Sequence, residues 1–377
     1  MSTAIEDRPQ PDQIAGAPHP RQTPILFGQS RAEADFLEAY STGRLHSGWL
    51  ITGPQGVGKA TLAWKIATFL LAEPPADAGF FGEAPPAPTS LAVSPDNNDA
   101  RLVQSGAHPR LSVVRRPWDE KADKLKTEIT ADPIRELKRF FHMSAADGGR
   151  RVVIVDAADE MNVTAANSLL KELEEPPALT TILLISHQPS RLLPTIRSRC
   201  RELRCATLGH DDMAAALHQA GVDVPNAESL ATLSEGSVGE AVRLLNHDGL
   251  GLYGDLVKLF GGLPNADRQV ALALANSCAG KGAETRFAMT LDLIDRFLAR
   301  TARAGIMGPP ATQGAAHESL LLAKLSPTHS AARSWAELGQ QLSARARHGR
   351  AVNLDPAALI LDMIFKIETT AKKTVTP

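Results

Sequence analysis

Residues 53–61 read GPQGVGKAT, and these residues indicate the fold of the segment around them. They follow the pattern G-x-x-x-x-G-K-[ST] of a phosphate-binding loop up to Lys59, and the backbone N–H groups of such a loop line a concavity at a helix N-terminus. The apolar strand pattern SGWLIT precedes it, and the apolar helical stretch ATLAWKIATFLLA follows. Because strand, glycine-rich turn and helix are the context that this loop requires, we predict a nucleotide-phosphate site. Its candidate residues are Gly53, Pro54, Gly56, Val57, Gly58, Lys59 and Thr61.

The last position of the pattern, where a hydroxyl would coordinate Mg²⁺, is Ala60. A methyl group cannot coordinate a metal ion. Thr61 carries a hydroxyl one position later, but successive side chains of a helix lie on different faces, so it is a poor substitute. Without a phosphate ligand, the same loop would serve only to pack a strand on a helix.

Composition excludes several classes of protein. The chain has 377 residues, of which 43% are hydrophobic, so it can bury a sizeable core. Forty basic and 42 acidic residues leave a net charge of −2, which marks neither a general nucleic-acid binder nor a membrane-surface protein. No run approaches the roughly 18 apolar residues of a membrane span. We expect a cytoplasmic protein with a polar, disordered leader at residues 1–21 and no membrane contact.

The cysteines predict neither a disulfide framework nor a zinc site. Only Cys200, Cys205 and Cys278 are present, and the C-x₄-C pair has no second pair to complete four ligands. We therefore expect small buried thiols and no structural zinc.

Strand and helix patterns alternate up to about residue 205. The continuous apolar runs VVIV at 152–155 and TILLIS at 181–186 are typical of strands that are buried on both faces of a parallel sheet. Asn162 is positioned to cap the helix that follows the first of these runs. An α/β domain is therefore expected at 22–205, with an irregular surface insertion at 74–108. Helical patterns dominate the remainder, which predicts a small helical domain at 206–250 and a helical bundle at 251–377.

A second acidic element lies at the end of the run VVIV. Asp156 stands where a nucleotide hydrolase holds Mg²⁺, but the next residue, where a glutamate would activate the attacking water, is Ala157. Asp159 and Glu160 follow and are expected to be solvated or capping charges near a helix start. Two groups that phosphoryl transfer needs are thus missing: the metal-binding hydroxyl at Ala60 and the water-activating carboxylate at Ala157.

Four segments together resemble the clamp-loader branch of the AAA+ ATPases. They are HSGWLITGPQGVGKATLA, VVIVDAADEMNVTAANSLLKELEEPP, TILLISHQPSRLLPTIRSRC and EGSVGEAVRLL, in this order and at these spacings. The resemblance covers roughly residues 22–250 by motif, and LLKELEEPP and SRC are its most specific parts. It implies an AAA+ P-loop domain with a parallel sheet, a small helical lid domain and a C-terminal helical collar domain that joins subunits into a ring.

The resemblance also implies roles for individual residues. Gly53–Lys59 correspond to the nucleotide loop, Asp156 to the metal-binding acid and Ser186 to the polar first sensor. Arg199, in the SRC element, corresponds to the arginine that one subunit extends into the ATP site of its neighbour. Such a guanidinium stabilises the charge that develops on the γ-phosphate in the transition state. Judged without the resemblance, Arg199 would be a surface ion pair.

Ala60, Ala157 and Gly239 depart from the motor subunits of this family. Gly239 stands where the second-sensor arginine belongs, and Arg243, four residues later, is not expected to replace it. The three positions remove a metal-binding hydroxyl, the water-activating carboxylate and one phosphate-binding cation. The resemblance therefore implies a non-motor subunit that binds ATP or ADP weakly if at all and has no ATPase activity of its own.

The implied partners are the delta and gamma/tau subunits of the DNA polymerase III clamp loader. Through that complex the chain would act on the sliding clamp and on primer–template DNA, within a DNA-directed DNA polymerase (nucleotidyltransferase) holoenzyme. The alternative is an active AAA+ ATPase, such as a gamma/tau-type motor subunit, that uses Thr61 and Asp159 as substitutes. A third possibility is a scaffold protein with a vestigial loop.

Overall fold

The computed structural model describes residues 10–72, 87–143, 149–222 and 227–375. The chain divides into two compact units. Unit 1 comprises residues 1–223 and 236–242, and unit 2 comprises residues 224–235 and 243–377. Helix α10 (Val238–Asn246) is shared between them.

Unit 1 is built on a five-stranded parallel sheet. The spatial order of its strands is β2-β5-β6-β1-β7. Their bounds are β1 Gly48–Thr52, β2 Leu111–Arg115, β5 Arg151–Asp156, β6 Thr180–Ser186 and β7 Arg201–Arg204. Strands β1, β5 and β6 are buried at every position, as continuous apolar runs require when both faces of a sheet are covered. The predicted α/β domain with a parallel sheet is confirmed.

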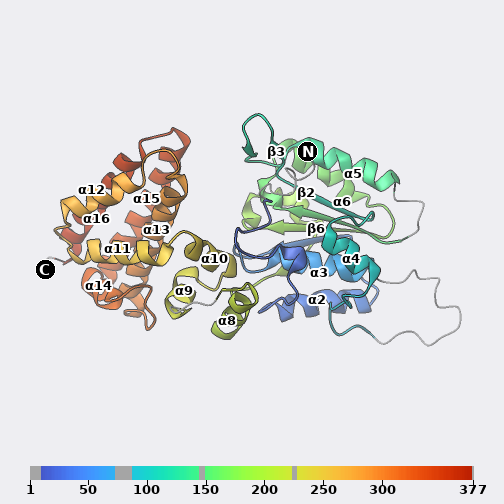
Figure 1. Ribbon diagram of the computed structural model, residues 1–377, viewed down its shortest axis with the longest axis horizontal. Helices are drawn as coiled ribbons and strands as arrows, with labels where there is room; N and C mark the ends of the chain where they lie inside the picture. The colour runs from blue at the N-terminus through green and yellow to red at the C-terminus, as the bar shows by residue number, and fades with distance from the viewer. Residues whose placement is uncertain (1–9, 73–86, 144–148, 223–226, 376–377) are drawn as a thin grey trace. The chain divides into compact units, whose positions relative to one another are not determined.

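Helices cover both faces of this sheet (Figure 1). On one face α5 packs on β2 and on α6, and the apolar core there includes Ile134, Leu169 and Ile182. On the other face α3 packs on the central strands and on α4. The helices are α2 Ser30–Ser41, α3 Lys59–Leu71, α4 Asn98–Ser105, α5 Ala131–Met143, α6 Val163–Glu174, α7 Pro194–Arg197 and α8 His210–Gln219, with 3₁₀ turns η1 Pro20–Gln22, η4 Ala158–Glu160 and η5 Pro189–Arg191.

The prediction for the N-terminus is wrong where it can be tested. Residues 1–9 lie outside the described residues, but residues 10–21 follow a defined path and are not a disordered leader. Asp12 and His19 are buried there, and a turn of 3₁₀ helix begins at Pro20. A polar, proline-rich composition indicated disorder because it shows no local periodicity, whereas the segment is held by distant partners.

Other expectations for unit 1 meet a mixed outcome. Asn162 caps α6 as predicted, and its Oδ1 accepts the backbone N–H of Ala165 at 2.9 Å. The insertion at 74–108 is not wholly irregular, because α4 lies within it, capped by Asn97; its residues 74–86 are outside the described ones. Strand β7 and the short hairpin of β3 (Trp118–Asp119) and β4 (Lys124–Leu125) were not expected.

Unit 2 is helical in the residues described. Its helices are α9 Ala227–Ser234, α11 Gly249–Gly261, α12 Arg268–Ser277, α13 Glu284–Met307, α14 Glu318–Leu325, α15 His329–Ala351 and α16 Pro356–Val375. Helices α13 and α15 pack together over most of their length, and large aromatic side chains fill the core. Phe260 and Phe297 lie with ring centroids 4.7 Å apart. Buried Glu318 accepts hydrogen bonds from Tyr253 and Arg300, so its charge is compensated.

No helix in the described part of the chain is long and apolar enough to cross a membrane. The predicted division at residues 205 and 250 stays a prediction, since the two compact units follow other bounds.

Candidate functional site

The carboxyl ends of the three central strands bring the predicted residues together. In the sheet register Thr52 of β1 pairs with Ser186 of β6, and Asp156 of β5 pairs with Ile185 of β6. The glycine-rich loop leaves the sheet directly after Thr52, so Asp156, Ser186 and the loop meet at one edge. This is the edge at which parallel α/β sheets bind ligands.

The loop 53–58 has the backbone shape that only glycine adopts without strain. Gly53, Gly56 and Gly58 have φ values of 140°, 77° and 100°. At Gly56, an added Cβ would collide with the Ser237 hydroxyl and would lie 2.9 Å from Gly239 Cα. Ser237 Oγ donates to the Gln55 carbonyl at 2.8 Å, and the Gly239 N–H donates to the Gly56 carbonyl at 3.0 Å. The start of α10 therefore fixes the loop from outside.

Lys59 is the first residue of α3, and its ammonium group is turned back onto its own loop. Nζ donates to the carbonyl of Gly53 at 2.7 Å and to that of Pro54. Burial lowers the pKa of Lys59 to about 8, although the nearby Asp156 and Asp159 act in the opposite direction. The Lys59 ammonium group, which would bind a phosphate, is thus at the predicted place, but it already donates hydrogen bonds to two carbonyls of its own loop.

Asp156 lies at the end of β5 and is buried. Burial raises its pKa to about 7, and the negative charges of Asp12 and Glu160 act in the same direction. Lys59 only partly offsets this. Burial and the neighbouring carboxylates thus both disfavour the charged form of Asp156, which is the form that would bind a metal ion.

Two further polar groups lie at the same sheet edge. Ser186 is fully buried, and its Oγ has no hydrogen-bond partner among the described residues. The backbone N–H of His187 donates to Asp159 Oδ1 at 2.9 Å. Burial, and next the charge of Lys59, lowers the pKa of His187 to about 4, so its ring is neutral at physiological pH. Of the two roles expected for Asp159, a solvated or a capping charge, this contact fits the second, since its carboxylate accepts a backbone N–H.

A segment that we call the strap, residues 10–27, crosses this edge, and the sequence did not predict it. Asp12 Oδ1 lies 2.7 Å from Arg115 Nη1 at the end of β2, and His19 meets the edge of the Trp64 ring on α3. Burial would raise the pKa of Asp12, but its contact with His19 and the charge of Arg115 lower it to about 2. Lys65 Nζ donates to the Pro24 carbonyl at 2.7 Å. The strap is therefore anchored at both ends.

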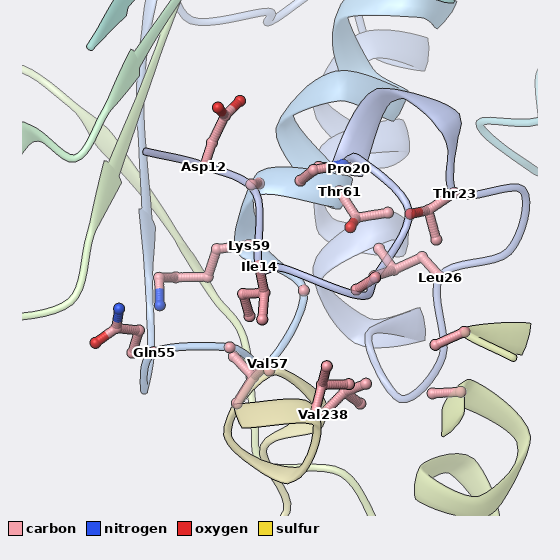
Figure 2. Close-up of a pocket in the computed structure, with 18 of the residues that line it drawn as sticks. Asp12, Ile14, Pro20, Thr23, Leu26, Gln55, Val57, Lys59, Thr61 and Val238 are labelled. Carbon is pink, nitrogen blue, oxygen red and sulfur yellow. The ribbon is translucent and has the colours of Figure 1, made fainter. Parts of the chain in front are cut away.

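The strap and the loop enclose a cavity of about 200 Å³ (Figure 2). In this close-up the segment that carries Asp12, Ile14 and Thr23 runs across the loop that carries Gln55 and Val57. Ile14 lies over Gly239, where an added Cβ would be only 2.5 Å from Ile14 Cδ1. The side chain at the predicted second-sensor position is thus replaced by one from the strap. Arg243 instead pairs with Asp292 at 2.7 Å.

Thr61, like Lys59 and Asp156, lines the cavity. In Figure 2 its side chain lies on the side of Pro20 and Thr23, whereas the Lys59 side chain extends the other way. Successive helical residues diverge in this manner, so the hydroxyl of Thr61 does not take the place of the one missing at Ala60.

Arg199 lies apart from this cavity, between α7 and β7. Its Nη2 is 2.7 Å from Glu174 Oε1 at the end of α6, and its Nη1 donates to the Thr195 carbonyl at 2.9 Å. The side chain remains about one third exposed, at 36%. It is therefore ordered within its own chain and still open to a second molecule.

A family model described as DNA polymerase III, delta subunit, matches residues 28–209. This span contains the loop, Asp156, Ser186 and Arg199. Residues 28–209 of this chain are therefore similar to the delta-subunit family. The match covers the α/β part of unit 1 and stops before α8, so the strap up to residue 27 and all of unit 2 lie outside it.

The curated proteins that are similar to this chain include further subunits of DNA polymerase III. DNA polymerase III subunit delta-prime of Pseudomonas aeruginosa is 42% identical over 221 residues, which are 58% of this chain and 59% of that protein. Delta-prime of Escherichia coli is 31% identical, over 56% of this chain and 58% of that protein. The chain thus spans about three fifths of the length of these relatives. Subunit tau of Escherichia coli is 26% identical over 69% of this chain and 40% of that protein.

Among solved structures, a gamma subunit-related protein of DNA polymerase III from Thermotoga maritima covers 91% of this chain and 100% of its own. It is 16% identical with a TM-score of 0.37, which is too low to add to the fold assignment. That assignment rests on the strand order and on the sequence matches of the delta-subunit family.

A nucleotide fits one end of the site and not the other. At the phosphate end, the Lys59 ammonium, the unpartnered Ser186 hydroxyl and the first N–H groups of α3 form a polar cradle. At the other end strap residues narrow the cavity, whose volume of about 200 Å³ is smaller than the roughly 300–1,000 Å³ of ordinary small-molecule sites. In the described residues, no three His, Cys, Asp or Glu side chains group closely enough to hold a metal ion.

Proposed function

We propose that this chain is a delta-prime-type, non-motor subunit of a DNA polymerase III clamp loader. One observation carries the proposal. The chain lacks the groups for ATP cleavage at Ala60, Ala157 and Gly239, yet it keeps an ordered, partly exposed Arg199 at the position of a trans-acting arginine. A motor subunit would need both sets of groups.

The rival role as an active ATPase has weaker support. Asp159 would have to activate the attacking water in place of the missing glutamate, but its Oδ1 already accepts the backbone N–H of His187. Thr61 would have to reach a metal from a face of α3 different from that of Ala60. Neither substitute is free in the way that the rival role requires.

The chemical role that we assign to Arg199 is electrostatic. As ATP is cleaved in a neighbouring subunit, negative charge builds up on the γ-phosphate oxygens, and a guanidinium beside them stabilises that charge. In the proposed assembly the neighbour is a gamma/tau subunit, and a delta subunit completes the ring. The complex would use ATP to open the sliding clamp and to place it on primer–template DNA in the cytoplasm.

The test is an assembled complex with gamma/tau and delta subunits of the same organism. We expect Arg199→Ala to lower clamp- and DNA-stimulated ATP turnover at least tenfold, a cautious part of the roughly 10³-fold that such arginines supply. Arg197→Ala is the matched control, because Arg197 is an exposed arginine two residues away. Unchanged turnover with Arg199→Ala, or an equal loss in both variants, would refute the assignment.

The isolated chain provides the second arm of the test. We expect no ATP turnover above about 0.1 s⁻¹, which is low beside typical enzymes. Faster turnover that disappears in Lys59→Ala would support the rival role as an active ATPase.

A further inference from the structure

The cavity above the glycine-rich loop has two chemically different ends. Lys59 and Asp156 line one end, where phosphate groups would lie. Leu26, Val238 and Val242 line the other, together with Leu208 and Ala216. An apolar slot next to a phosphate cradle suits a flat base, whose faces are apolar and whose edge carries donors and acceptors.

At the exposed rim of the apolar end, the backbone N–H and C=O of Ile25 present a donor and an acceptor side by side. Both are already engaged by a single side chain, that of Gln219 at the end of α8. The Ile25 N–H donates to Gln219 Oε1 at 3.0 Å, and Gln219 Nε2 donates to the Ile25 carbonyl at 2.9 Å. The two residues are 194 positions apart in the chain.

A carboxamide and the Watson–Crick edge of adenine present the same pattern. Adenine has an amino donor beside a ring-nitrogen acceptor, and the amide of glutamine has an NH₂ donor beside a carbonyl acceptor. Guanine carries its carbonyl acceptor and ring N–H donor in the reverse order, so a guanine whose sugar lies on the same side would meet the Ile25 backbone donor to donor and acceptor to acceptor. The peptide of Ile25 is therefore suited to read adenine, and Gln219 occupies it in the way that adenine would.

Ile14 closes the space between the two ends. It lies against Gly239, which itself packs on Gly56 of the loop. The strap that carries Ile14 is held by Asp12 on Arg115 and by Pro24 on Lys65. These contacts keep an apolar side chain where the sugar and a second-sensor side chain would otherwise lie.

We propose that Gln219 acts as an intramolecular substitute for adenine and, together with Ile14, determines that this site excludes adenine nucleotides. Lys59 and Ser186 remain at the phosphate end, whereas Gln219 and Ile14 occupy the other end of the cavity. The proposal concerns only the chain's own site. It is independent of Arg199 and of the role in a clamp loader.

The test measures ADP and GDP binding to the isolated full chain by titration calorimetry. Gln219→Ala should raise the affinity for ADP about tenfold, because two hydrogen bonds no longer compete with the base. Affinity for GDP should rise less, since guanine does not match the Ile25 edge. Ile14→Ala should raise the affinities for ADP and GDP alike, because it enlarges the cavity but leaves the Ile25 backbone bonded to Gln219.

Two controls make the result specific. Gln341→Ala removes an exposed glutamine of α15 and should leave ADP affinity unchanged. Adding Lys59→Ala to Gln219→Ala should abolish the gain, which places the gained binding at the loop. The melting temperature of each variant reports whether it is folded.

Three outcomes would overturn the proposal. The first is wild-type protein that binds ADP as tightly as folded Gln219→Ala does. The second is an equal gain for ADP and GDP in Gln219→Ala, which would deny a role for the base edge. The third is a gain that persists in Gln219→Ala/Lys59→Ala, which would place the binding elsewhere. None of these results bears on the Arg199 experiment, so the two proposals can fail separately.

Discussion

Arg199 Nη2 lies 2.7 Å from Glu174 Oε1, so the end of α6 holds the side chain that follows α7. The pair is partly exposed, and a pair of this kind contributes about 0.2–1 kcal/mol to stability. The ion pair therefore serves mainly to orient the Arg199 side chain and contributes little to the stability of the fold. A guanidinium that is already oriented loses less conformational entropy when a neighbouring phosphate engages it.

The first prediction concerns this pair. Glu174→Gln should lower ATP turnover of the assembled complex about two- to fivefold, less than Arg199→Ala, because the guanidinium is kept but less well oriented. The fall should be in kcat and not in the KM for ATP. The neighbouring exposed Glu175→Gln is the control, and a loss as large as that of Arg199→Ala would show that Glu174 acts in another way.

The second prediction is a pH dependence that comes from Asp156. Its pKa is raised to about 7 in the folded state, so the folded chain keeps the proton that the unfolded chain gives up from a pKa of 3.8. The destabilisation that results grows as pH rises from about 4 to 7 and is complete above 7. Asp156→Asn should therefore be stabilising, by about 2 kcal/mol more at pH 8.5 than at pH 5. Urea unfolding at the two pH values measures this, and an equal effect at both would contradict it.

The third prediction concerns Gly239. A methyl group there would lie 2.5 Å from Ile14 Cδ1 and 2.8 Å from Gly56 Cα, so Gly239→Ala should destabilise the α/β unit by about 1–3 kcal/mol. Adding Ile14→Ala should restore part of the loss, because it removes the nearer atom. Gly254→Ala is the control: it lies in α11 with nothing within 4 Å and should be stabilising by about 0.5–1 kcal/mol.

The fourth prediction concerns the buried hydroxyl of Ser186. Because its Oγ has no partner among the described residues, Ser186→Ala should leave the unfolding free energy unchanged or raise it by up to about 1 kcal/mol. In the Gln219→Ala background the same change should weaken ADP binding about tenfold, if the hydroxyl meets a phosphate. Ser168→Ala, whose hydroxyl bonds the Thr164 carbonyl on the exposed side of α6, should do neither.

The sequence predicted those parts of the fold that local pattern determines. Strands β1, β5 and β6 each have a continuous apolar centre and are buried at every position, and the loop between β1 and α3 carries glycines where φ is positive. The neighbouring positions of Asp156 and Ser186 followed, because parallel strands end at one edge. Strand β7, RELR, lies at the edge of the sheet, and only its Leu203 is buried. Its three charged residues give no apolar pattern, so the sequence did not predict this strand.

The strap could not be predicted because each of its anchors is far away in the sequence. Asp12 meets Arg115 across 103 residues, and Ile25 meets Gln219 across 194. Nothing in the local composition of residues 10–27 encodes these partners. Gly239 was the one indication of the strap in the sequence. It has no side chain at the predicted second-sensor position, which leaves room there for Ile14 of the strap.

Lys59 bonds the carbonyls of Gly53 and Pro54 within its own loop, and this has a consequence for the assembled machine. The loop needs no anion to hold its shape, so the folding of this domain is not linked to the supply of ATP in the cell. In the ring that we propose, such a protomer would keep its shape while ATP is bound and cleaved in its neighbours.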